Sequence, residues 1–383
     1  MKRIAAALLL ALALAPACAL AFDLSPYILP HGEWDESYSP PVPLSADDYL
    51  QTYFHPGEDF EATLNFEHRL LRVKEGARVL DIPLDDPPDA GFNPLLYEDG
   101  RFGLLQSVGY GEETKEMWKH HYTIYDVEGE TLANPRTLDG DPYALALYPF
   151  GFAGMRDYDE DQSELVLYDA KTLGPFFRYV VPFGRAFVQD ACQSGGAVYL
   201  LLRQSGHPNL SDCIVLRILD GQLDWVYHTT DENYRYNCIF SDGQGGVLLK
   251  GSLREDYKRS RLTHLNAAGK GFWSKTLTGK NAVIHPSLTI PNSNGTATLY
   301  GTCIARSRGL FTIFAMTLGA QGDILALDVR DYSARADTGP SLLLAQDGTV
   351  LVYSFEIDSE HQPGVLVPFD ALPKADDPGI VLE

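Results

Sequence analysis

Short runs of consecutive apolar residues recur along the chain, and polar turns separate them. The clearest runs lie at 165–168, 197–202, 213–216, 246–249, 310–314 and 349–353. A strand is continuously apolar when both of its faces are buried, whereas a strand with one solvated face alternates. No stretch shows a sustained helical period with caps at both ends. The pattern therefore predicts an all-β fold with strands buried on both faces.

Glycine turns punctuate these runs in two interleaved series. The first series, at positions 100, 151, 195, 243, 295 and 348, has spacings of 51, 44, 48, 52 and 53 residues. The second, at 76, 129, 174, 221, 269 and 322, has spacings of 53, 45, 47, 48 and 53 residues. Asp-Gly and Asn-Gly pairs favour hairpins because both central residues of a type I′ turn need a positive φ. The two series predict a repeat of two hairpins, that is, of four antiparallel strands.

Four-stranded antiparallel sheets that repeat in this way and are buried on both faces are typical of the blades of a β-propeller. Residues 49–383 divided among seven blades give about 48 residues per blade, which agrees with the spacings. We predict a single β-propeller of seven four-stranded antiparallel blades. Six or eight blades follow if an end repeat is miscounted.

Two of the outer turns carry a Trp four residues after the turn glycine. They read Asp220-Gly221-Gln222-Leu223-Asp224-Trp225 and Gly269-Lys270-Gly271-Phe272-Trp273. These segments resemble the blade motif of PQQ-like (pyrroloquinoline-quinone-type) propeller repeats, which share a WD40-like architecture. The resemblance implies that Trp225 and Trp273 dock against the next blade. The quinone enzymes of that family place two adjacent cysteines over the cofactor; no two cysteines are adjacent here, so we expect no PQQ and assign no cofactor.

The N-terminus has the pattern of a secretory signal peptide. Lys2 and Arg3 precede an apolar run at 4–14, and the segment ends in Ala19-Leu20-Ala21. We predict a signal peptide over 1–21, cleaved after Ala21, and a Pro-rich acidic leader over 22–48. Cys18 offers a second route, because a cysteine after an apolar stretch can be lipidated in a bacterial lipoprotein.

The charge of the chain excludes one class of partner. Lys and Arg number 30 against 52 Asp and Glu, a formal charge of −22. A strongly acidic protein repels the phosphate backbone, so we do not expect nucleic acid as a partner. No other segment is apolar for long enough to span a membrane. We expect a monomer, secreted or attached to the cell envelope of a bacterium, with the pairing of Cys192, Cys213, Cys238 and Cys303 left open.

The strongest local signal for a metal site is acidic. Asp157, Asp159 and Asp161 alternate along one loop, and alternate carboxylates can converge on a calcium ion. Position six of this loop is Gln162 where calcium loops have Gly, and no acid follows at positions nine or twelve. The alternative is a solvated acidic loop between the second and third strands of blade three.

Other polar and aromatic groups allow a functional and a structural interpretation. His120 and His121 are adjacent, so on a strand they point to opposite faces and do not ligate one metal easily. The basic segment 254–261 could bind an anionic partner, but Glu255 and Asp256 dilute its charge. Three tyrosines could form a recognition face or pack between blades; they are Tyr227, Tyr234 and Tyr236.

No catalytic signature stands out, since the G-x-S-x-G elbow, H-E-x-x-H and the Walker loop are all missing. The sequence favours a secreted, non-catalytic propeller that binds a protein or polysaccharide ligand. The alternative is a polysaccharide-active enzyme of lyase or glycosidase type, with carboxylates from several blades at the channel mouth. A third hypothesis, an envelope-assembly lipoprotein, depends on lipidation of Cys18.

Overall fold

The computed structural model describes most of the chain beyond residue 40. The described residues are 41–44, 48–56, 64–74, 77–84, 91–96, 101–108, 119–126, 128–137, 144–148, 151–159, 162–169, 172, 174–182, 184–204, 213–229, 233–253, 259–280, 282–305, 311–332, 340–345, 347–355 and 364–383. The signal peptide and Cys18 lie outside them, as does the leader up to residue 40.

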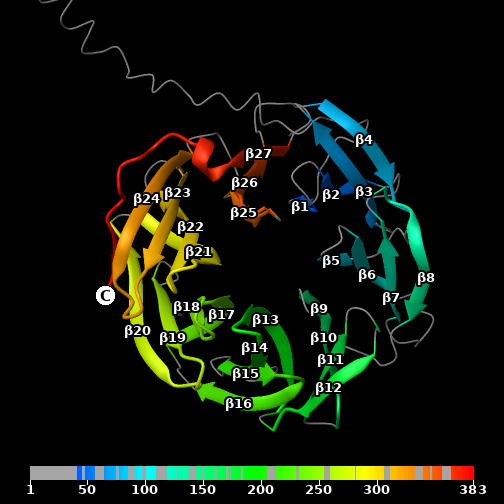
Figure 1. Ribbon diagram of the computed structural model, residues 1–383, viewed down its shortest axis with the longest axis horizontal. Coiled ribbons are helices and arrows are strands. Elements are labelled where there is room, and N and C mark those ends of the chain that lie inside the picture. The colour runs from blue at the N-terminus through cyan, green and yellow to red at the C-terminus, as the bar shows by residue number, and fades with distance from the viewer. Residues whose placement is uncertain are drawn as a thin grey trace, which may run out of the picture.

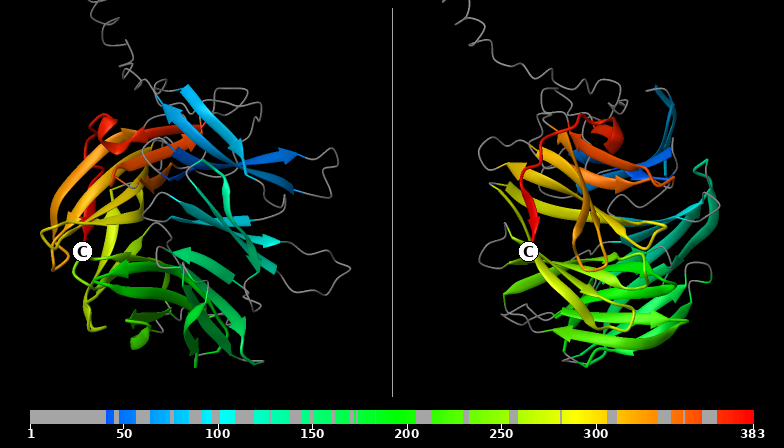
Figure 2. Two further views of the ribbon diagram at one scale, coloured as in Figure 1. Left: turned by 45° about the vertical axis from the view of Figure 1, so that its right-hand side comes forward. Right: turned by 60° about the vertical axis from the view of Figure 1, so that its left-hand side comes forward.

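The described strands form six hydrogen-bonded antiparallel sheets, arranged in succession around a central axis (Figures 1 and 2). The largest of them, β17 to β24 with β28, consists of two four-stranded parts, which we number separately as sheets 5 and 6. Sheet 1 consists of β1 (Val42–Pro43), β2 (Asp48–Pro56), β3 (Leu64–Lys74) and β4 (Ala77–Pro83). Sheet 2 consists of β5 (Gly91–Leu96), β6 (Phe102–Val108), β7 (Lys119–Tyr125) and β8 (Thr131–Thr137). Sheet 3 consists of β9 (Ala144–Tyr148), β10 (Gly151–Asp157), β11 (Ser163–Asp169) and β12 (Pro175–Val180).

The second half of the chain continues the pattern. Sheet 4 consists of β13 (Ala186–Ser194), β14 (Ala197–Gln204), β15 (Cys213–Leu219) and β16 (Gln222–Thr229). Sheet 5 consists of β17 (Tyr234–Ser241), β18 (Val247–Leu253), β19 (Ser260–Leu265) and β20 (Gly271–Gly279). Sheet 6 consists of β21 (Ala282–Pro291), β22 (Ala297–Ala305), β23 (Phe311–Leu318) and β24 (Ile324–Tyr332). Sheet 7 consists of β25 (Ser341–Leu344), β26 (Val350–Phe355) and β27 (Gly364–Pro368).

This arrangement is a β-propeller, and it confirms the predicted fold class. The first strand of each sheet borders the centre of the ring, and the later strands lie progressively outward (Figure 1). Sheets 5 and 6 are joined by a single pair, Gly279 with Ala282. The number of blades in the whole chain stays a prediction, because parts of the chain lie outside the described residues.

The first strand begins earlier than the predicted boundary at residue 49. Val42 pairs with Leu50 and Pro43 with Tyr49, so β1 lies inside the segment predicted as leader. Leu44, which follows β1, is buried. A strand of two residues carries too short a pattern to be recognised in the sequence.

The core is a series of apolar layers between neighbouring sheets. β14 and β15 are buried over nearly their whole length, as their continuous apolar runs predict. Leu165 and Leu167 of sheet 3 pack in one layer with Leu200 and Leu202 of sheet 4. Sheets 7 and 1 share a layer as well, and this closes the ring; its members are Tyr49, Leu71, Ala345, Leu351, Tyr353 and Leu366.

The glycine turns gather at one end of the ring. Because neighbouring strands are antiparallel, the turn between the first and second strands lies at the same end of a sheet as the turn between the third and fourth. We call this end the turn face. Two of its turns have two central residues of positive φ, as a type I′ hairpin requires: Gly195-Gly196 (57° and 78°) and Asp220-Gly221 (50° and 73°).

The C-terminal segment crosses from sheet 7 to sheet 5. After the short 3-10 helix η2 (Phe369–Ala371), it runs beside β24, where the Ala375 N–H donates to the Val329 carbonyl at 2.9 Å. It ends in β28 (Ile380–Leu382), which pairs antiparallel with the outermost strand β20 (Figure 1). The tail therefore bridges three sheets, and it covers an outer edge of the ring.

Within the residues that the structure describes, no helix is both long and apolar enough to cross a membrane.

Candidate functional site

Trp225 and Trp273 each contact the turn of the following sheet. The Trp225 indole Nε1 on β16 donates to the Ala267 carbonyl of sheet 5 at 2.9 Å. The Trp273 indole on β20 donates in the same way to the Ala320 carbonyl of sheet 6 at 3.1 Å. A Cβ atom added at Gly269 or Gly322 would lie only 2.7 Å from the facing indole ring. Glycine at these turns therefore leaves the space that each indole occupies.

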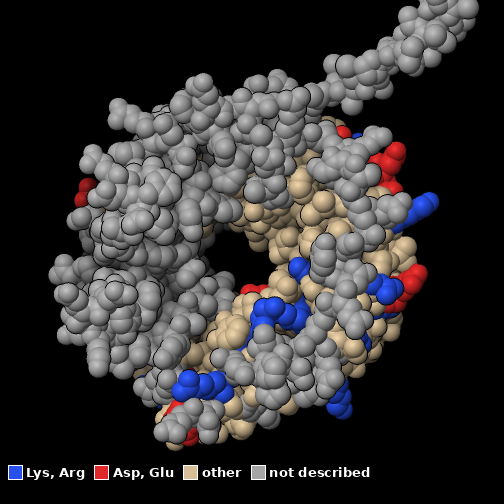
Figure 3. All heavy atoms as spheres, turned by 180° about the vertical axis from the view of Figure 1, so that it is seen from behind, with Lys and Arg blue, Asp and Glu red and all other residues tan. Residues whose placement is uncertain are grey.

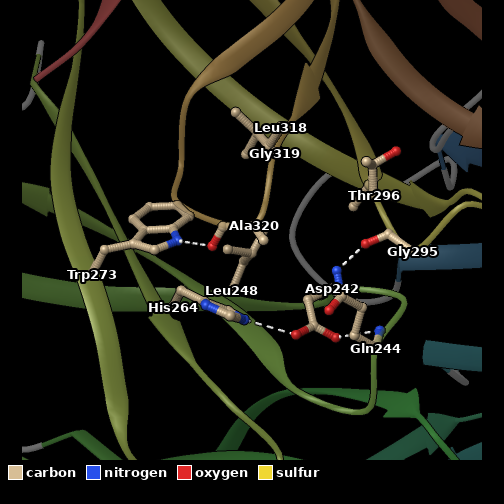
Figure 4. Close-up of a pocket in the computed structure, with 11 residues that line it drawn as sticks. Asp242, Gln244, Leu248, His264, Trp273, Gly295, Thr296, Leu318, Gly319 and Ala320 are labelled. Atoms are coloured by element: carbon tan, nitrogen blue, oxygen red, sulfur yellow. Dashed lines mark hydrogen bonds and ion pairs between the residues drawn. The ribbon is translucent and has the colours of Figure 1, made fainter.

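A pocket lies between sheets 5 and 6 at the turn face, beside Trp273 (Figure 4). Its polar groups centre on Asp242, which begins the turn between β17 and β18. The Asp242 Oδ1 accepts the backbone N–H groups of Gln244 at 2.7 Å and Gly246 at 2.8 Å. The Asp242 Oδ2 lies 2.7 Å from His264 Nε2 on β19. Burial alone would raise the pKa of Asp242, but these hydrogen bonds outweigh it and lower the pKa.

His264 is enclosed by aromatic rings. Its imidazole lies 5.7 Å from the ring of Trp273 and 5.8 Å from the ring of Phe272. Its second nitrogen, Nδ1, is shielded from solvent and has no hydrogen-bond partner among the described residues. The pocket has room for about one water molecule, which is too little for a sugar or a nucleotide. The contact of Asp242 with His264 connects the turn of sheet 5 to the end of β19, so its geometry is that of a structural contact.

A second group of polar residues lies on the innermost strands, which border the central opening seen in Figure 3. The innermost strands of sheets 4, 5 and 6 each contain a β-bulge, at Gln189, Asn237 and Ser287. Each bulged residue stands five positions before the residue that begins the next turn, which is Ser194, Asp242 or Asn292. A bulge leaves one residue without a partner across the ladder and redirects its side chain.

Asp190 follows the bulge of sheet 4 and connects it to sheet 5. Its Oδ2 accepts the backbone N–H of Ile239 on β17 at 2.8 Å, and its Oδ1 accepts the N–H of Ala191 at 2.9 Å. Burial raises the pKa of Asp190 to about 6 although both hydrogen bonds and the charge of Lys250 lower it. The carboxyl is therefore poised to exchange a proton slightly below neutral pH.

Lys250 is a buried cation close to this carboxyl. Its side chain, on β18, is 8% exposed, and no hydrogen bond or ion pair to it exists in the described part of the chain. Its charge acts on Asp190 of sheet 4, and it also lowers the pKa of Cys238 and His285. For Cys238, burial outweighs the charge and raises the pKa, whereas for His285 burial itself lowers it. The ammonium therefore lies where sheets 4, 5 and 6 meet.

The three residues of the predicted calcium loop are only partly within the described structure. Asp157 ends β10, but its side chain is outside the described set, and Asp161 is wholly outside it. Asp159 is exposed, and its Oδ1 accepts the backbone N–H of Gln162 at 2.7 Å. No group of three or more His, Cys, Asp or Glu residues able to hold a metal occurs among the described residues. The calcium site stays a prediction.

The tyrosines that allowed two interpretations pack between sheets 4 and 5. Tyr236 is buried, and its hydroxyl lies 3.0 Å from Thr263 Oγ1. Tyr227 and Tyr234 are partly buried against the same apolar layer. The interpretation of these residues as packing between blades is therefore confirmed.

The remaining sequence candidates lie largely outside the described residues. His120 and His121 lie on β7, but their side chains are outside the described residues, as are residues 254–258 of the basic segment. Arg261, at the end of that segment, stacks on the ring of Tyr234 at 4.6 Å. Cys192, Cys213, Cys238 and Cys303 form no disulfide in the described structure.

The sequence did not reveal Asp190, Lys250 or the pair of Asp242 with His264 as a set. In the sequence, Asp242 is recognisable only as the residue that precedes the turn glycine at position 243. The only sequence signal for this region was a polar residue five positions before three of the turns, at Gln189, Asn237 and Ser287. Without the structure, nothing in the sequence shows that these three residues occupy equivalent bulges in neighbouring sheets.

Comparison with known proteins supports the fold and nothing finer. No family model and no curated protein matches the sequence. A prolyl endopeptidase structure has a TM-score of 0.54 at 12% identity; the match covers 98% of this chain and 53% of that one. A Kuenenia stuttgartiensis hydrazine synthase structure has a TM-score of 0.51 at 9% identity, covering 88% of this chain and 97% of that one. The β-propeller domain of the Trilobed protease from Pyrococcus furiosus has a TM-score of 0.44 at 12% identity, covering 76% and 95%.

Proposed function

We propose that this protein is a binding module that holds its ligand at the central opening of the ring and does not convert it. The observation that carries the proposal is that Asp242 and His264 are engaged in contacts within the fold. This acid and imidazole have the residue types of a catalytic pair, yet Asp242 Oδ1 accepts two turn N–H groups and the Ser194 hydroxyl, and Oδ2 contacts His264. The carboxylate is therefore engaged in holding the turn and the neighbouring strands together, which supports a structural rather than a catalytic role.

Rigidity at the turn face supports the same proposal. Indole contacts at Ala267 and Ala320 fix neighbouring sheets to one another. Gly195 and Gly245 approach so closely that a Cβ at Gly195 would lie 2.6 Å from the Gly245 Cα. A preorganised ring loses little conformational freedom when it binds, which favours affinity.

The direct test compares binding with turnover on one sample. The purified protein is incubated with a panel of polysaccharides, and both the retained material and any new reducing or unsaturated ends are measured. We expect retained chains of unchanged length. Shortened chains would contradict the proposal and favour an enzyme.

The alternative, a polysaccharide-active enzyme, has one observation in its favour. Asp190 has a pKa raised to about 6, as a general acid near neutral pH requires, and it lies close to the charge of Lys250. If turnover is detected, Asp190→Asn should abolish it. Turnover that survives this substitution would remove Asp190 from the mechanism.

We further propose that the chain is exported, with residues 1–21 removed as a signal peptide. The apolar run and the Ala-Leu-Ala end support this. Mass spectrometry of the mature N-terminus tests it: a chain beginning at Phe22 is expected, whereas an acylated Cys18 would support an envelope-assembly lipoprotein instead.

Calcium binding by the 157–161 loop is kept as a separate proposal, supported by three alternating carboxylates. Calorimetry with calcium should give heat that Asp159→Ala reduces. No heat at millimolar calcium would remove the calcium site.

A further inference from the structure

In the described part of the chain, sheet 7 has one strand fewer than the other sheets. Sheets 1 to 6 have four strands each, whereas sheet 7 consists of β25, β26 and β27. The outer edge of β27 therefore pairs with no described strand. In sheets 1 to 6, a fourth strand covers this edge and then leads into the first strand of the next sheet.

The burial of β27 is that of a third strand and not of an outermost one. Its central residues Val365, Leu366 and Val367 are 1%, 7% and 0% exposed. The third strands β11 and β15 are buried in the same way, whereas the fourth strands β12 and β16 carry several exposed residues. One face of β27 belongs to an apolar layer with β23 of sheet 6, and the other face to the layer shared with sheet 1. The remaining edge presents N–H and C=O groups that can accept a further strand.

Strand spacing along the chain indicates where a fourth strand can come from. In sheets 1 to 6 the fourth strand is six to nine residues long, and two to eight residues connect it to the first strand of the next sheet. Sheet 1 follows sheet 7 around the ring, and its first strand begins at Val42. The same lengths, counted back from Val42, place a strand within residues 25–39. The predicted cleavage after Ala21 leaves this segment in the exported chain.

The other parts of the chain are less suited to this edge. The C-terminal segment is bound elsewhere, because the Ala375 N–H donates to Val329 of sheet 6 and β28 pairs with β20 of sheet 5. Every other stretch outside the described residues lies between two described strands and is at most ten residues long. The segment before Val42 is therefore the part of the chain with both the length and the position for this edge.

This segment also carries the kind of aromatic residue that fourth strands have after their turn. Phe176, Trp225 and Trp273 follow a turn glycine by two to four residues, and each faces the turn of the next sheet. Trp34 follows a glycine by two residues, as Phe176 does. We propose that residues 25–39 supply the fourth strand of sheet 7, antiparallel to β27, and so join the last sheet of the ring to the first.

Hydrogen–deuterium exchange of the chain that begins at Phe22 tests the proposal. We expect slow exchange in peptides covering 364–368 and in peptides covering 25–39, because the two strands protect each other. Deleting residues 25–39 should speed exchange at 364–368 by at least about tenfold. A synthetic peptide with the sequence of 25–39, added to this deletion variant, should slow that exchange again.

The matched control removes a strand from the other end of the chain. Deleting residues 380–383 takes away β28, which pairs with β20. This variant should exchange faster in β20 at 277–279 and be unchanged at 364–368. Exchange in the buried strand β14 serves as the folding check, and it should stay slow in both variants.

Three results would overturn the proposal. The first is fast exchange throughout 25–39 in the undeleted chain, which decides the matter even if the deletion variant does not fold. The second is slow exchange at 364–368 that the deletion leaves unchanged. The third is slow exchange at 364–368 that is lost on dilution, which would assign the edge to a second copy of the chain. None of these results depends on the ligand of the central opening, so the proposed function is tested separately.

Discussion

At the scale of single residues, glycine and tryptophan fix how neighbouring sheets meet. Gly269 has a φ of 72°, and its missing side chain leaves the space that Trp225 fills. Gly196 has a similar φ of 78°, but a Cβ there would meet nothing within 4 Å. A substitution at Gly196 would therefore introduce backbone strain alone, whereas a substitution at Gly269 would introduce the same strain and a clash with the neighbouring sheet.

Replacing each glycine by Ala should therefore give different losses of stability. Gly196→Ala pays only for the left-handed backbone, about 1–2 kcal/mol. Gly269→Ala adds a collision with the indole, which should cost about 1–3 kcal/mol more. Denaturant unfolding measures both, and the difference should shrink when Trp225 is also replaced by Ala. Equal losses in the two single variants would show that the indole contact contributes nothing.

Two buried carboxyls should respond to pH in opposite directions. The folded pKa of Asp190, about 6, lies above its ordinary value of 3.8, so this residue favours the fold at low pH and the benefit is lost as pH rises through 6. Asp190→Asn keeps an acceptor for Ile239 and should be more stable than the unsubstituted protein at pH 7.5, by up to about 3 kcal/mol, but not at pH 4.

Asp242 provides the control of opposite sign. Its folded pKa is lowered, so its contribution is present above the ordinary value and is lost as pH falls through the folded pKa. Asp242→Asn should therefore destabilise the protein at pH 7.5, and the loss should shrink in acid. Urea midpoints at the two pH values measure both variants; the same pH trend in both would contradict the assignment.

At the scale of strands, the sequence was informative where a pattern is local and long. The run at 197–202 and the turn at Asp220-Gly221 predicted β14 and a type I′ hairpin, because burial on both faces and positive φ leave marks in the residues themselves. β1 is only two residues long, and β28 pairs with a strand about a hundred residues earlier, so neither leaves a local pattern.

The site was hidden for the same physical reason. In a sequence, a polar residue within a strand cannot be told from an ordinary solvated position. Its neighbours become known only when the register of strand pairing is known. Asn237 and Lys250 become one feature only through the ladder between β17 and β18, and Asp190 joins them from another sheet. Proximity that depends on register and ring closure cannot be read from spacing along the chain.

The C-terminal strand makes a prediction at this scale. Ile380 of β28 is 6% exposed and packs with Leu277, whereas the next residue, Val381, is 42% exposed. Ile380→Ala should reduce stability by about 2–4 kcal/mol, and Val381→Ala by less than about 0.5 kcal/mol. Chemical denaturation compares them. Similar small effects would mean that the tail does not support sheet 5.

At the scale of the whole molecule, contacts that stabilise the ring lie at the turn face, and the account assigns ligand binding to the innermost strands. The turn face is occupied by contacts between sheets, namely indoles on carbonyls and closely packed glycines, and by the contact of Asp242 with His264 within sheet 5. The innermost strands of sheets 4, 5 and 6 have aligned bulges, and the charge of Lys250 on the adjoining strand β18 acts on Asp190 of sheet 4. Binding at the centre is the role that this division favours.

Hydrogen–deuterium exchange with and without a saturating amount of a polysaccharide that the protein retains tests this division most directly. Apart from the single Gly279–Ala282 pair of β21 and the Ile239 N–H that Asp190 accepts, the inner edges of β13, β17 and β21 pair with no strand among the described residues, so a ligand at the opening should slow the exchange of N–H groups there. The account predicts new protection in peptides that cover Gln189, Asn237 and Ser287, and none in the turn at 242–246. Protection confined to the turn face, or found nowhere on the ring, would contradict it.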